Sequence, residues 1–201
     1  MKIIFYGDSN TYGFDPRGYS GGRYDVKDIW TVLVQEMLGS GWQVINEGMN
    51  GRRLPAGDYA SAYMEELFAS LSPEDFFAVM LGTNDLLVSM EPDARKPVRR
   101  MEELLERLTN KADGPRLLII APPYIGGREC PGTDPLMAGY FEESVRMNEG
   151  FRCLAERYGV MFADAAKWGI ELAYDDVHFS ENGHRMFAVH ISEVLRKAGS
   201  K

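Results

Sequence analysis

Cysteine, histidine and long apolar runs are scarce in this sequence. Its 201 residues include 2 cysteines, Cys130 and Cys153, and 3 histidines. Two cysteines are too few for a disulfide-dense scaffold and their spacing fits no zinc motif, so both are predicted to be free thiols in a reducing compartment. Nowhere do 18 apolar residues run together, and residues 1–10 lack the apolar stretch of a signal peptide. We therefore expect a cytoplasmic protein that does not insert into membranes.

Positive charge is also in short supply. Lys and Arg number 22 against 30 Asp and Glu, which gives a formal net charge of −8 at pH 7. Such a chain is a poor candidate for binding nucleic acid or an anionic membrane surface. The histidines and carboxylates show no spacing typical of a metal site, and the first predicted strand is not followed by a dinucleotide-binding motif. We expect a small-molecule ligand, with no metal and no cofactor.

Apolar residues are present in sufficient number to build a full core. Hydrophobic residues make up 45% of the chain, and its 21 glycines and 10 prolines follow no period. No linker is long enough to divide the chain. These features predict one domain over residues 1–201.

Short apolar runs typical of buried strands alternate with helical patterns. The predicted strands are residues 2–6, 42–46, 76–81, 116–121 and 160–163, and the predicted helices lie near residues 29–38, 61–71, 92–112, 141–158 and 181–198. Strands that alternate with helices pair in parallel through right-handed crossovers. The expected fold class is therefore α/β, a three-layer α/β/α sandwich around a five-stranded, mostly parallel sheet. Residues 126–139 are a candidate active-site flap.

Polar segments directly follow the first three predicted strands, where a sheet of this kind binds its ligands. The segment GDSN places the Ser9 hydroxyl at a tight turn near backbone N–H groups. The segment NEGMNGR contains Gly48, whose N–H can approach a ligand closely because no Cβ blocks it. The segment GTND contains Asn84, whose side-chain amide can donate two hydrogen bonds. The sequence thus predicts a hydroxyl and several donors in one cleft.

A fourth segment, DDVH, precedes the last predicted helix. A carboxylate three residues before His178 could turn back onto Nδ1–H of the imidazole, which would fix the tautomer and leave Nε2 free to act as a base. A hydroxyl, a base, an orienting acid and hydrogen-bond donors are the parts that an acyl-transfer site needs.

In chain order, these segments resemble the four sequence blocks of the SGNH hydrolase superfamily, also called GDSL-type esterases and lipases. Ser9, Gly48, Asn84 and His178 match the four residues of the name, and the resemblance extends from Gly7 to His184. It is nearest to the arylesterase and acyltransferase-like branch. It implies the flavodoxin-like SGNH hydrolase fold and a serine carboxylic-ester hydrolase that works through an acyl-enzyme.

The resemblance also implies a role for each matched residue. Ser9 would be the nucleophile, His178 the base and Asp175 the acid, because the family's Asp lies three residues before its His. The N–H groups of Ser9 and Gly48 and the Asn84 side chain would form the oxyanion hole. The chain departs from the family at Asn10 and Tyr12, which are expected to line the mouth of the site and to contact substrate. Two further residues, Tyr124 and Met137, flank the candidate flap and are also possible substrate contacts.

Several alternatives stay open at this point. The branch favours small, short-acyl esters such as acetates, with release of the acyl group to water or to another alcohol. Lysophospholipid or thioester hydrolysis uses the same machinery, and a non-catalytic ligand-binding module could use the same fold. The remaining histidines, His184 and His190, are better explained by packing in the last helix. A homo-oligomer is also conceivable, through an exposed face containing Trp30 or Trp168.

Overall fold

The computed structural model describes residues 1–18, 22–111, 113–126 and 135–199. Its strands are β1 (Lys2–Gly7), β2 (Gln43–Gly48), β3 (Phe76–Met80), β4 (Arg116–Ala121) and β5 (Met161–Asp164). They form one sheet in the order β2-β1-β3-β4-β5, and every neighbouring pair is parallel. The order changes direction at β1, which lies between β2 and β3, so the carboxyl end of β1 is the switch point where such sheets bind ligands.

The central strands are apolar because both faces of the sheet are covered. All residues of β3, and all but the first residue of β1 and of β4, are buried. Alternate β1 side chains enter separate cores, with Ile4 and Tyr6 on one face and Ile3 and Phe5 on the other. A parallel sheet buried in this way shows continuous apolar runs rather than alternation.

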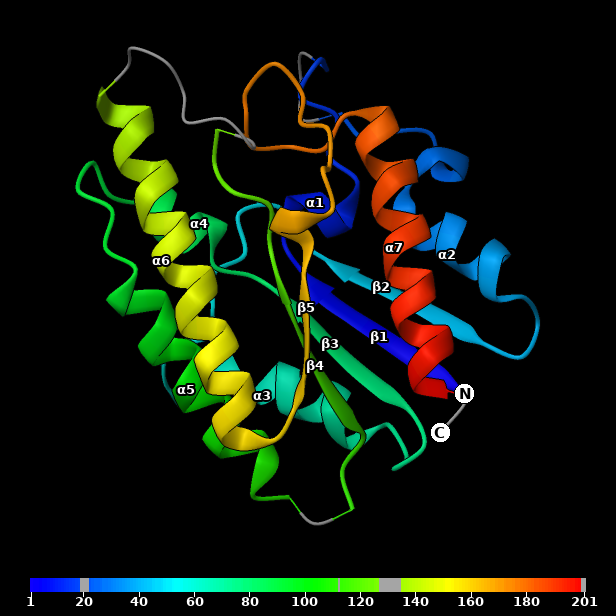
Figure 1. Ribbon diagram of the computed structural model, residues 1–201. Coiled ribbons are helices and arrows are strands. Elements are labelled where there is room, and N and C mark those ends of the chain that lie inside the picture. The colour runs from blue at the N-terminus through cyan, green and yellow to red at the C-terminus, as the bar shows by residue number, and fades with distance from the viewer. Residues whose placement is uncertain (19–21, 112, 127–134, 200–201) are drawn as a thin grey trace.

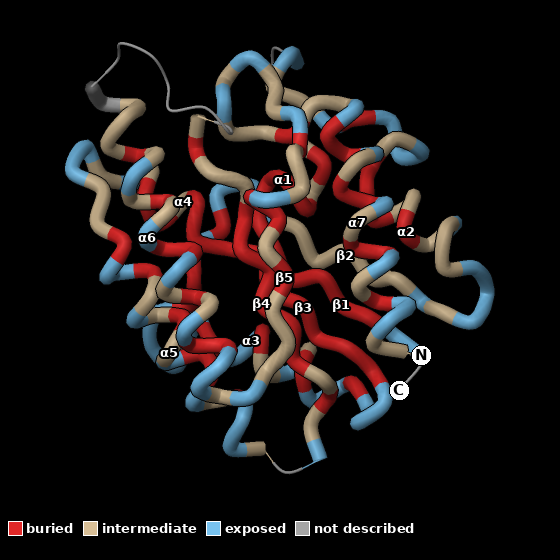
Figure 2. The backbone as a smooth tube through the Cα atoms, viewed as in Figure 1, coloured by how far each residue is buried: buried red, intermediate tan, exposed pale blue. Residues whose placement is uncertain are grey.

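Helices cover both faces and complete the three layers (Figure 1). The longer helices are α2 (Trp30–Leu38), α3 (Gly57–Ala69), α5 (Arg95–Thr109), α6 (Pro135–Tyr158) and α7 (Glu181–Gly199), and the short ones are α1 (Ser9–Tyr12) and α4 (Thr83–Leu87). One core contains buried residues of α3, α5 and α6, and the other contains buried residues of α2 and α7. Figure 2 shows the buried strands between exposed helix faces. The α/β sandwich expected from the sequence is confirmed, and its sheet is entirely parallel among the described strands.

Several element boundaries differ from the predicted ones. The helix predicted near 92–112 is shorter, Arg95–Thr109: residues 92 and 93 are irregular and residue 94 lies in a turn. The helix predicted near 141–158 begins earlier, at Pro135, so the last part of the candidate flap is helical. The rest of that flap, residues 127–134 with Cys130, lies outside the described residues.

Two expectations about exposed residues can be compared with the structure. Cys153 is a free, exposed cysteine, as predicted. Trp30 is fully buried, which contradicts the idea that it lies on an exposed face; its indole N–H donates to the carbonyl of Asn10 at 2.9 Å. Trp168 is half-buried and packs against Phe187. Among the described residues, no helix is long and apolar enough to cross a membrane.

Candidate active site

The nucleophile candidate lies on a short helix directly after β1. Asp8 caps this helix: its Oδ1 accepts the Asn10 N–H at 3.0 Å. Ser9 is the first residue of α1 and is buried, at 7% exposure. Gly13 ends the helix with φ of 89°, a left-handed conformation that glycine adopts without strain. The turn between β1 and α1 therefore holds the Ser9 hydroxyl at the carboxyl end of β1.

The base candidate lies on a loop before α7 that its own carboxylate stabilises. Asp175 Oδ1 accepts the backbone N–H groups of Val177 and His178, at 3.2 and 3.0 Å. Asp176 adopts φ of 57°, which turns the chain sharply between the acid and the histidine. The spacing of three residues thus allows one carboxylate to hold both the loop backbone and the ring.

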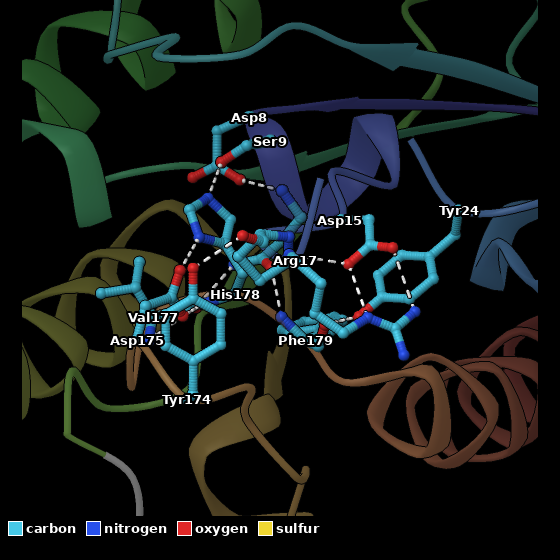
Figure 3. Close-up of polar contacts among 12 residues, drawn as sticks. Asp8, Ser9, Asp15, Arg17, Tyr24, Tyr174, Asp175, Val177, His178 and Phe179 are labelled. Atoms are coloured by element: carbon cyan, nitrogen blue, oxygen red, sulfur yellow. Dashed lines mark hydrogen bonds and ion pairs between the residues drawn. The ribbon is translucent and has the colours of Figure 1, made fainter. Parts of the chain in front are cut away.

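The structure brings Ser9, His178 and Asp175 into one chain of contacts, which Figure 3 shows with the imidazole between the other two side chains. The Oδ2 atom of Asp175 lies 2.6 Å from Nδ1 of His178, and Nε2 lies 2.9 Å from Oγ of Ser9. Because a carboxylate only accepts, Nδ1 carries the proton, and Nε2 is free to accept the hydroxyl proton. Residues 169 apart in sequence are therefore within direct hydrogen-bonding distance.

The sequence suggested that Asn10 lines the mouth of the site. In the structure Asn10 is instead buried, at 5% exposure. Its Nδ2 donates to the Val177 carbonyl at 3.1 Å, and its Oδ1 accepts the Phe179 N–H at 2.8 Å. These are the two neighbours of His178 in the chain. Asn10 therefore connects the helix that carries Ser9 to the loop that carries His178, a role that a motif alone does not reveal.

Gly48 also differs from the expectation. Its N–H donates to Oδ1 of Asn46 at 2.9 Å, so it is not free for a ligand. The Asn46 amide is itself held by the Thr11 carbonyl and the Thr31 hydroxyl, at 2.7 and 2.8 Å. A Cβ at position 48 would lie 2.1 Å from the Tyr12 backbone nitrogen. Glycine occurs here because β2 approaches α1 closely. This packing requirement explains why position 48, which the sequence suggested as an oxyanion donor, is a glycine.

The residues that follow Gly48, in the turn after β2, lie close to Asn84. Asn84 Nδ2 donates to the Arg52 carbonyl at 3.1 Å and lies 3.5 Å from Oδ2 of Asp8. Gly51, just before Arg52, is exposed and has φ of 73°. The Arg52 guanidinium is buried, donates to the Gly7 carbonyl at 3.0 Å and lies over the Tyr6 ring. Arg52 thus fixes this turn to the end of β1, and the sequence analysis missed it because a single arginine in a loop carries no specific signal.

Two acids at the site differ in how their environments shift the pKa. Burial raises the pKa of Asp8 to about 6, although the Asn10 N–H and the nearby His178 partly oppose this shift. Burial also acts to raise the pKa of Asp175, but hydrogen bonds from the ring and backbone of His178 outweigh it and hold the pKa below its usual value. Asp175 is therefore ionised at neutral pH and can stabilise an imidazolium.

The other predicted substrate contacts lie on three separate elements. Tyr12 is half-buried, and the Arg23 guanidinium lies 4.4 Å from its ring centroid. Tyr124 packs edge-to-face on Phe141 of α6, and Met137 packs on the core from the first turns of α6. Their aromatic and apolar partners account for their positions.

The two other histidines pack as expected. His184 is fully buried, and its Nδ1 accepts the backbone N–H of Trp30 at 3.3 Å. Burial lowers the pKa of His184 to about 4. His190 stacks on Trp168, with ring centroids 5.3 Å apart. The described residues include no group of three or more His, Cys, Asp or Glu side chains that could hold a metal ion.

Comparison with known proteins places this geometry in a family. Residues 5–186 match the GDSL-like lipase/acylhydrolase family. The chain belongs to this family. The Ser9–His178–Asp175 contact therefore lies in an esterase fold. The protein is a carboxylic ester hydrolase that acts on small-molecule esters.

Solved structures agree with the assignment to the GDSL-like family. The aryl esterase of M. smegmatis is 25% identical, with a TM-score of 0.82 and 98% of each chain covered. A putative arylesterase from Agrobacterium tumefaciens is 27% identical, with a TM-score of 0.81 and 98% of each chain covered. A carbohydrate acetylesterase family member from Sinorhizobium meliloti is 27% identical, with a TM-score of 0.82 and coverage of 100% of this chain and 99% of that one. No match was found among curated proteins.

Proposed function

We propose that this GDSL-family enzyme hydrolyses short-acyl, acetyl-type esters through an acyl-enzyme on Ser9. The observation that carries the proposal is the continuous contact from Ser9 Oγ to His178 Nε2, at 2.9 Å, and from Nδ1 to Asp175, at 2.6 Å. Two similar structures, an aryl esterase and a carbohydrate acetylesterase family member, support small esters as the substrate class. A hydroxyl adjacent to an oriented base is the requirement for nucleophilic acyl transfer.

In the proposed mechanism, Ser9 Oγ attacks the ester carbonyl carbon while its proton moves to His178 Nε2. The carbonyl π electrons move to oxygen, and when they return, the C–O bond to the alcohol breaks and the alcohol takes the proton from His178. Water then attacks the acyl-enzyme, gives its proton to His178, and Ser9 leaves and recovers that proton. Another alcohol in place of water gives acyl transfer. Asp175 stabilises the imidazolium in each half-reaction.

The oxyanion is proposed to accept hydrogen bonds from the Ser9 N–H and the Asn84 amide. For the third donor we propose the N–H of Gly51 in place of Gly48, whose N–H is bonded to Asn46. Gly51 is exposed, and the Arg52 carbonyl that follows it accepts from Asn84. Removing one such donor typically lowers kcat by about 10²- to 10³-fold.

A panel of p-nitrophenyl esters from acetate to palmitate, with a thioester and a lysophospholipid, tests the proposal. We expect the largest kcat/KM on acetate, and a loss of about 10⁴-fold or more in kcat for Ser9→Ala. Ser70→Ala, an exposed serine on the far end of α3, is the matched control and should retain activity. Preference for palmitate or the lysophospholipid would overturn the short-acyl assignment. Absence of a fluorophosphonate adduct on folded protein would instead favour a binding module.

A further inference from the structure

A cavity of about 630 Å³ lies beside the proposed active site. Its walls include residues that directly follow two segments of that site. Asp85 comes after Asn84 on α4, and Arg53 comes after the Gly51–Arg52 turn. Its lining residues are Arg53, Asp85, Val88, Asp93, Arg95, Lys96, Arg99 and Arg100. The first turns of α5, the helix that follows α4 in the chain (Figure 1), complete this wall.

The lining is strongly cationic although the chain as a whole is anionic. Five of its eight residues are Lys or Arg and two are Asp, whereas the whole chain carries a net charge of −8. A cavity lined by one sign of charge raises the local concentration of ions of the opposite sign. The net positive charge of this lining therefore favours anions over cations, although Asp93 and Asp85 pair with Arg95 and Arg100.

Two arginines present their guanidinium groups to the cavity in different ways. Arg100 is fixed by the buried carboxylate of Asp85, at 2.6 Å, and Asp85 also accepts the Leu54 N–H at 3.0 Å. Arg53 is exposed and interacts with Asp85 only at longer range, without a close ion pair among the described residues. One arginine is thus held in place and the other keeps its hydrogen-bonding capacity, which suits bidentate recognition of a carboxylate or phosphate.

The helix that forms the wall carries its positive charges in unfavourable positions. Arg95 and Arg99, and likewise Lys96 and Arg100, lie four residues apart on α5, so like charges are neighbours on its surface. Arg99 has only a distant ion pair, 3.6 Å, with Glu103. An anion in the cavity would relieve this repulsion.

A second cavity shares two of these arginines and borders the turn at Asn84. Arg53 and Arg100 line this second cavity of about 660 Å³, whose walls include Gly51 and Arg52 of the turn at Asn84. An ester bound at Ser9 could therefore extend along the turn to reach both arginines.

We propose that Arg53, Lys96, Arg99 and Arg100 form a subsite for an anionic group, a carboxylate or a phosphate, carried by the ester substrate. The inference rests on the proposed ester hydrolysis at Ser9 and narrows its substrate class to anionic short-acyl esters. Arg53, Lys96 and Arg99, which have no ion pair shorter than 3.6 Å among the described residues, contribute most to the preference for the anion.

The first experiment compares matched anionic and neutral esters. One pair, 4-acetoxybenzoate and 4-acetoxybenzamide, places the charge on the alcohol; another, p-nitrophenyl hydrogen succinate and p-nitrophenyl butyrate, places it on the acyl group. In Arg53→Gln, Arg99→Gln and the double variant, we expect the anionic-to-neutral ratio of kcat/KM to fall about tenfold in at least one pair, because each lost cation weakens only the charged ester. Arg152→Gln, a half-buried arginine on α6 that pairs with Glu149 and Glu156, is the control and should leave the ratio unchanged.

Unchanged ratios in both pairs, with active enzyme, would overturn the subsite alone. Absence of turnover on all four esters by the wild type would overturn the proposed ester hydrolysis and the subsite with it.

A second experiment measures anion binding without turnover. Inorganic phosphate at constant ionic strength should raise the Tm of the wild type. The double variant that carries both Arg53→Gln and Arg99→Gln should show no such shift. If phosphate stabilises the protein through these arginines while the ester ratios stay unchanged, the cavity binds a free anion, which would overturn the substrate subsite. Absence of any arginine-dependent shift, together with unchanged ratios, would show that the cavity binds no anion.

Discussion

At the scale of single residues, the site depends on side chains that hold other side chains. Asp175 holds the His178 ring and the loop backbone together, and Arg52 fixes the turn beside Asn84. Asn10 is bonded on both sides of His178 although it adjoins Ser9 in the sequence. These contacts determine the distance between hydroxyl and imidazole, to which the rate of acyl transfer is sensitive.

The first residue-scale prediction concerns Asn10 as a positioning residue. Asn10→Leu removes both bonds to the histidine loop, and Asn10→Asp keeps only the acceptor for the Phe179 N–H. We expect kcat on p-nitrophenyl acetate to fall about 10- to 100-fold in Asn10→Leu and less in Asn10→Asp, because a small displacement of His178 disturbs proton transfer. KM should change little, since Asn10 is buried and does not contact substrate.

Two comparisons separate positioning from general destabilisation. The rate of fluorophosphonate labelling at Ser9 should fall in parallel with kcat, measured well below the Tm of each variant. Asn182→Ala, at an exposed site on α7, should alter neither quantity. A raised KM with unchanged kcat in Asn10→Leu would show that Asn10 contacts substrate after all.

At the scale of elements, the site depends on how closely β2 and α1 approach. Gly48 ends β2 directly against the backbone of Thr11 and Tyr12, and the Asn46 side chain bonds across the same contact to the Thr11 carbonyl. The helix that carries Ser9 is only four residues long, so it derives its stability from these neighbours rather than from its own hydrogen bonds.

The element-scale prediction is that Gly48→Ala destabilises the protein and displaces α1. The added methyl group would lie 2.1 Å from the Tyr12 backbone nitrogen, a contact that rigid backbone cannot relieve without moving. Overpacking of this kind costs about 3 kcal/mol, measured as the free energy of unfolding in urea. Gly41→Ala, at an exposed glycine with no atom within 4 Å, should change stability by less than about 0.5 kcal/mol. Equal stability of the two variants would contradict the packing role of Gly48.

At the scale of the whole molecule, the buried Asp8 couples stability to pH. Its pKa rises from 3.8 to about 6 on folding, chiefly because burial disfavours the charged carboxylate. The folded state therefore binds this proton more tightly than the unfolded state. The resulting stabilisation is complete below pH 3.8 and is lost as pH rises through about 6, a change of about 3 kcal/mol.

The whole-molecule prediction follows from Asp8→Asn, which is neutral at every pH. Relative to the wild type, the variant should gain about 2 kcal/mol of stability between pH 4 and pH 7, because only the wild type must ionise a buried carboxyl over that range. Urea unfolding of both proteins at several pH values gives the difference, in which the other titrating groups cancel. Parallel stability curves would show that the Asp8 pKa is not raised by folding.

The amino-acid sequence was sufficient to predict the layers of the fold and the residues of the Ser9–His178–Asp175 contact. Apolar runs separated by helical periodicity are local properties, and the carboxyl ends of parallel strands meet at one edge of a sheet. The motif order in the chain matched the blocks of the family. Element boundaries were less predictable: α6 begins six residues before its predicted start.

Only the tertiary structure decided how the remaining polar groups are used. In the sequence, Gly48 and Asn10 looked equally available for a ligand. In the structure, the N–H of Gly48 donates to Asn46, and the side chain of Asn10 bonds to the loop that carries His178. The same holds for the buried Trp30 and for the arginines that line one cavity with Asp85 in an otherwise acidic chain. Hydrogen-bond partners and local charge depend on which distant segments meet in space, and a residue's type and its neighbours in the chain do not contain that information.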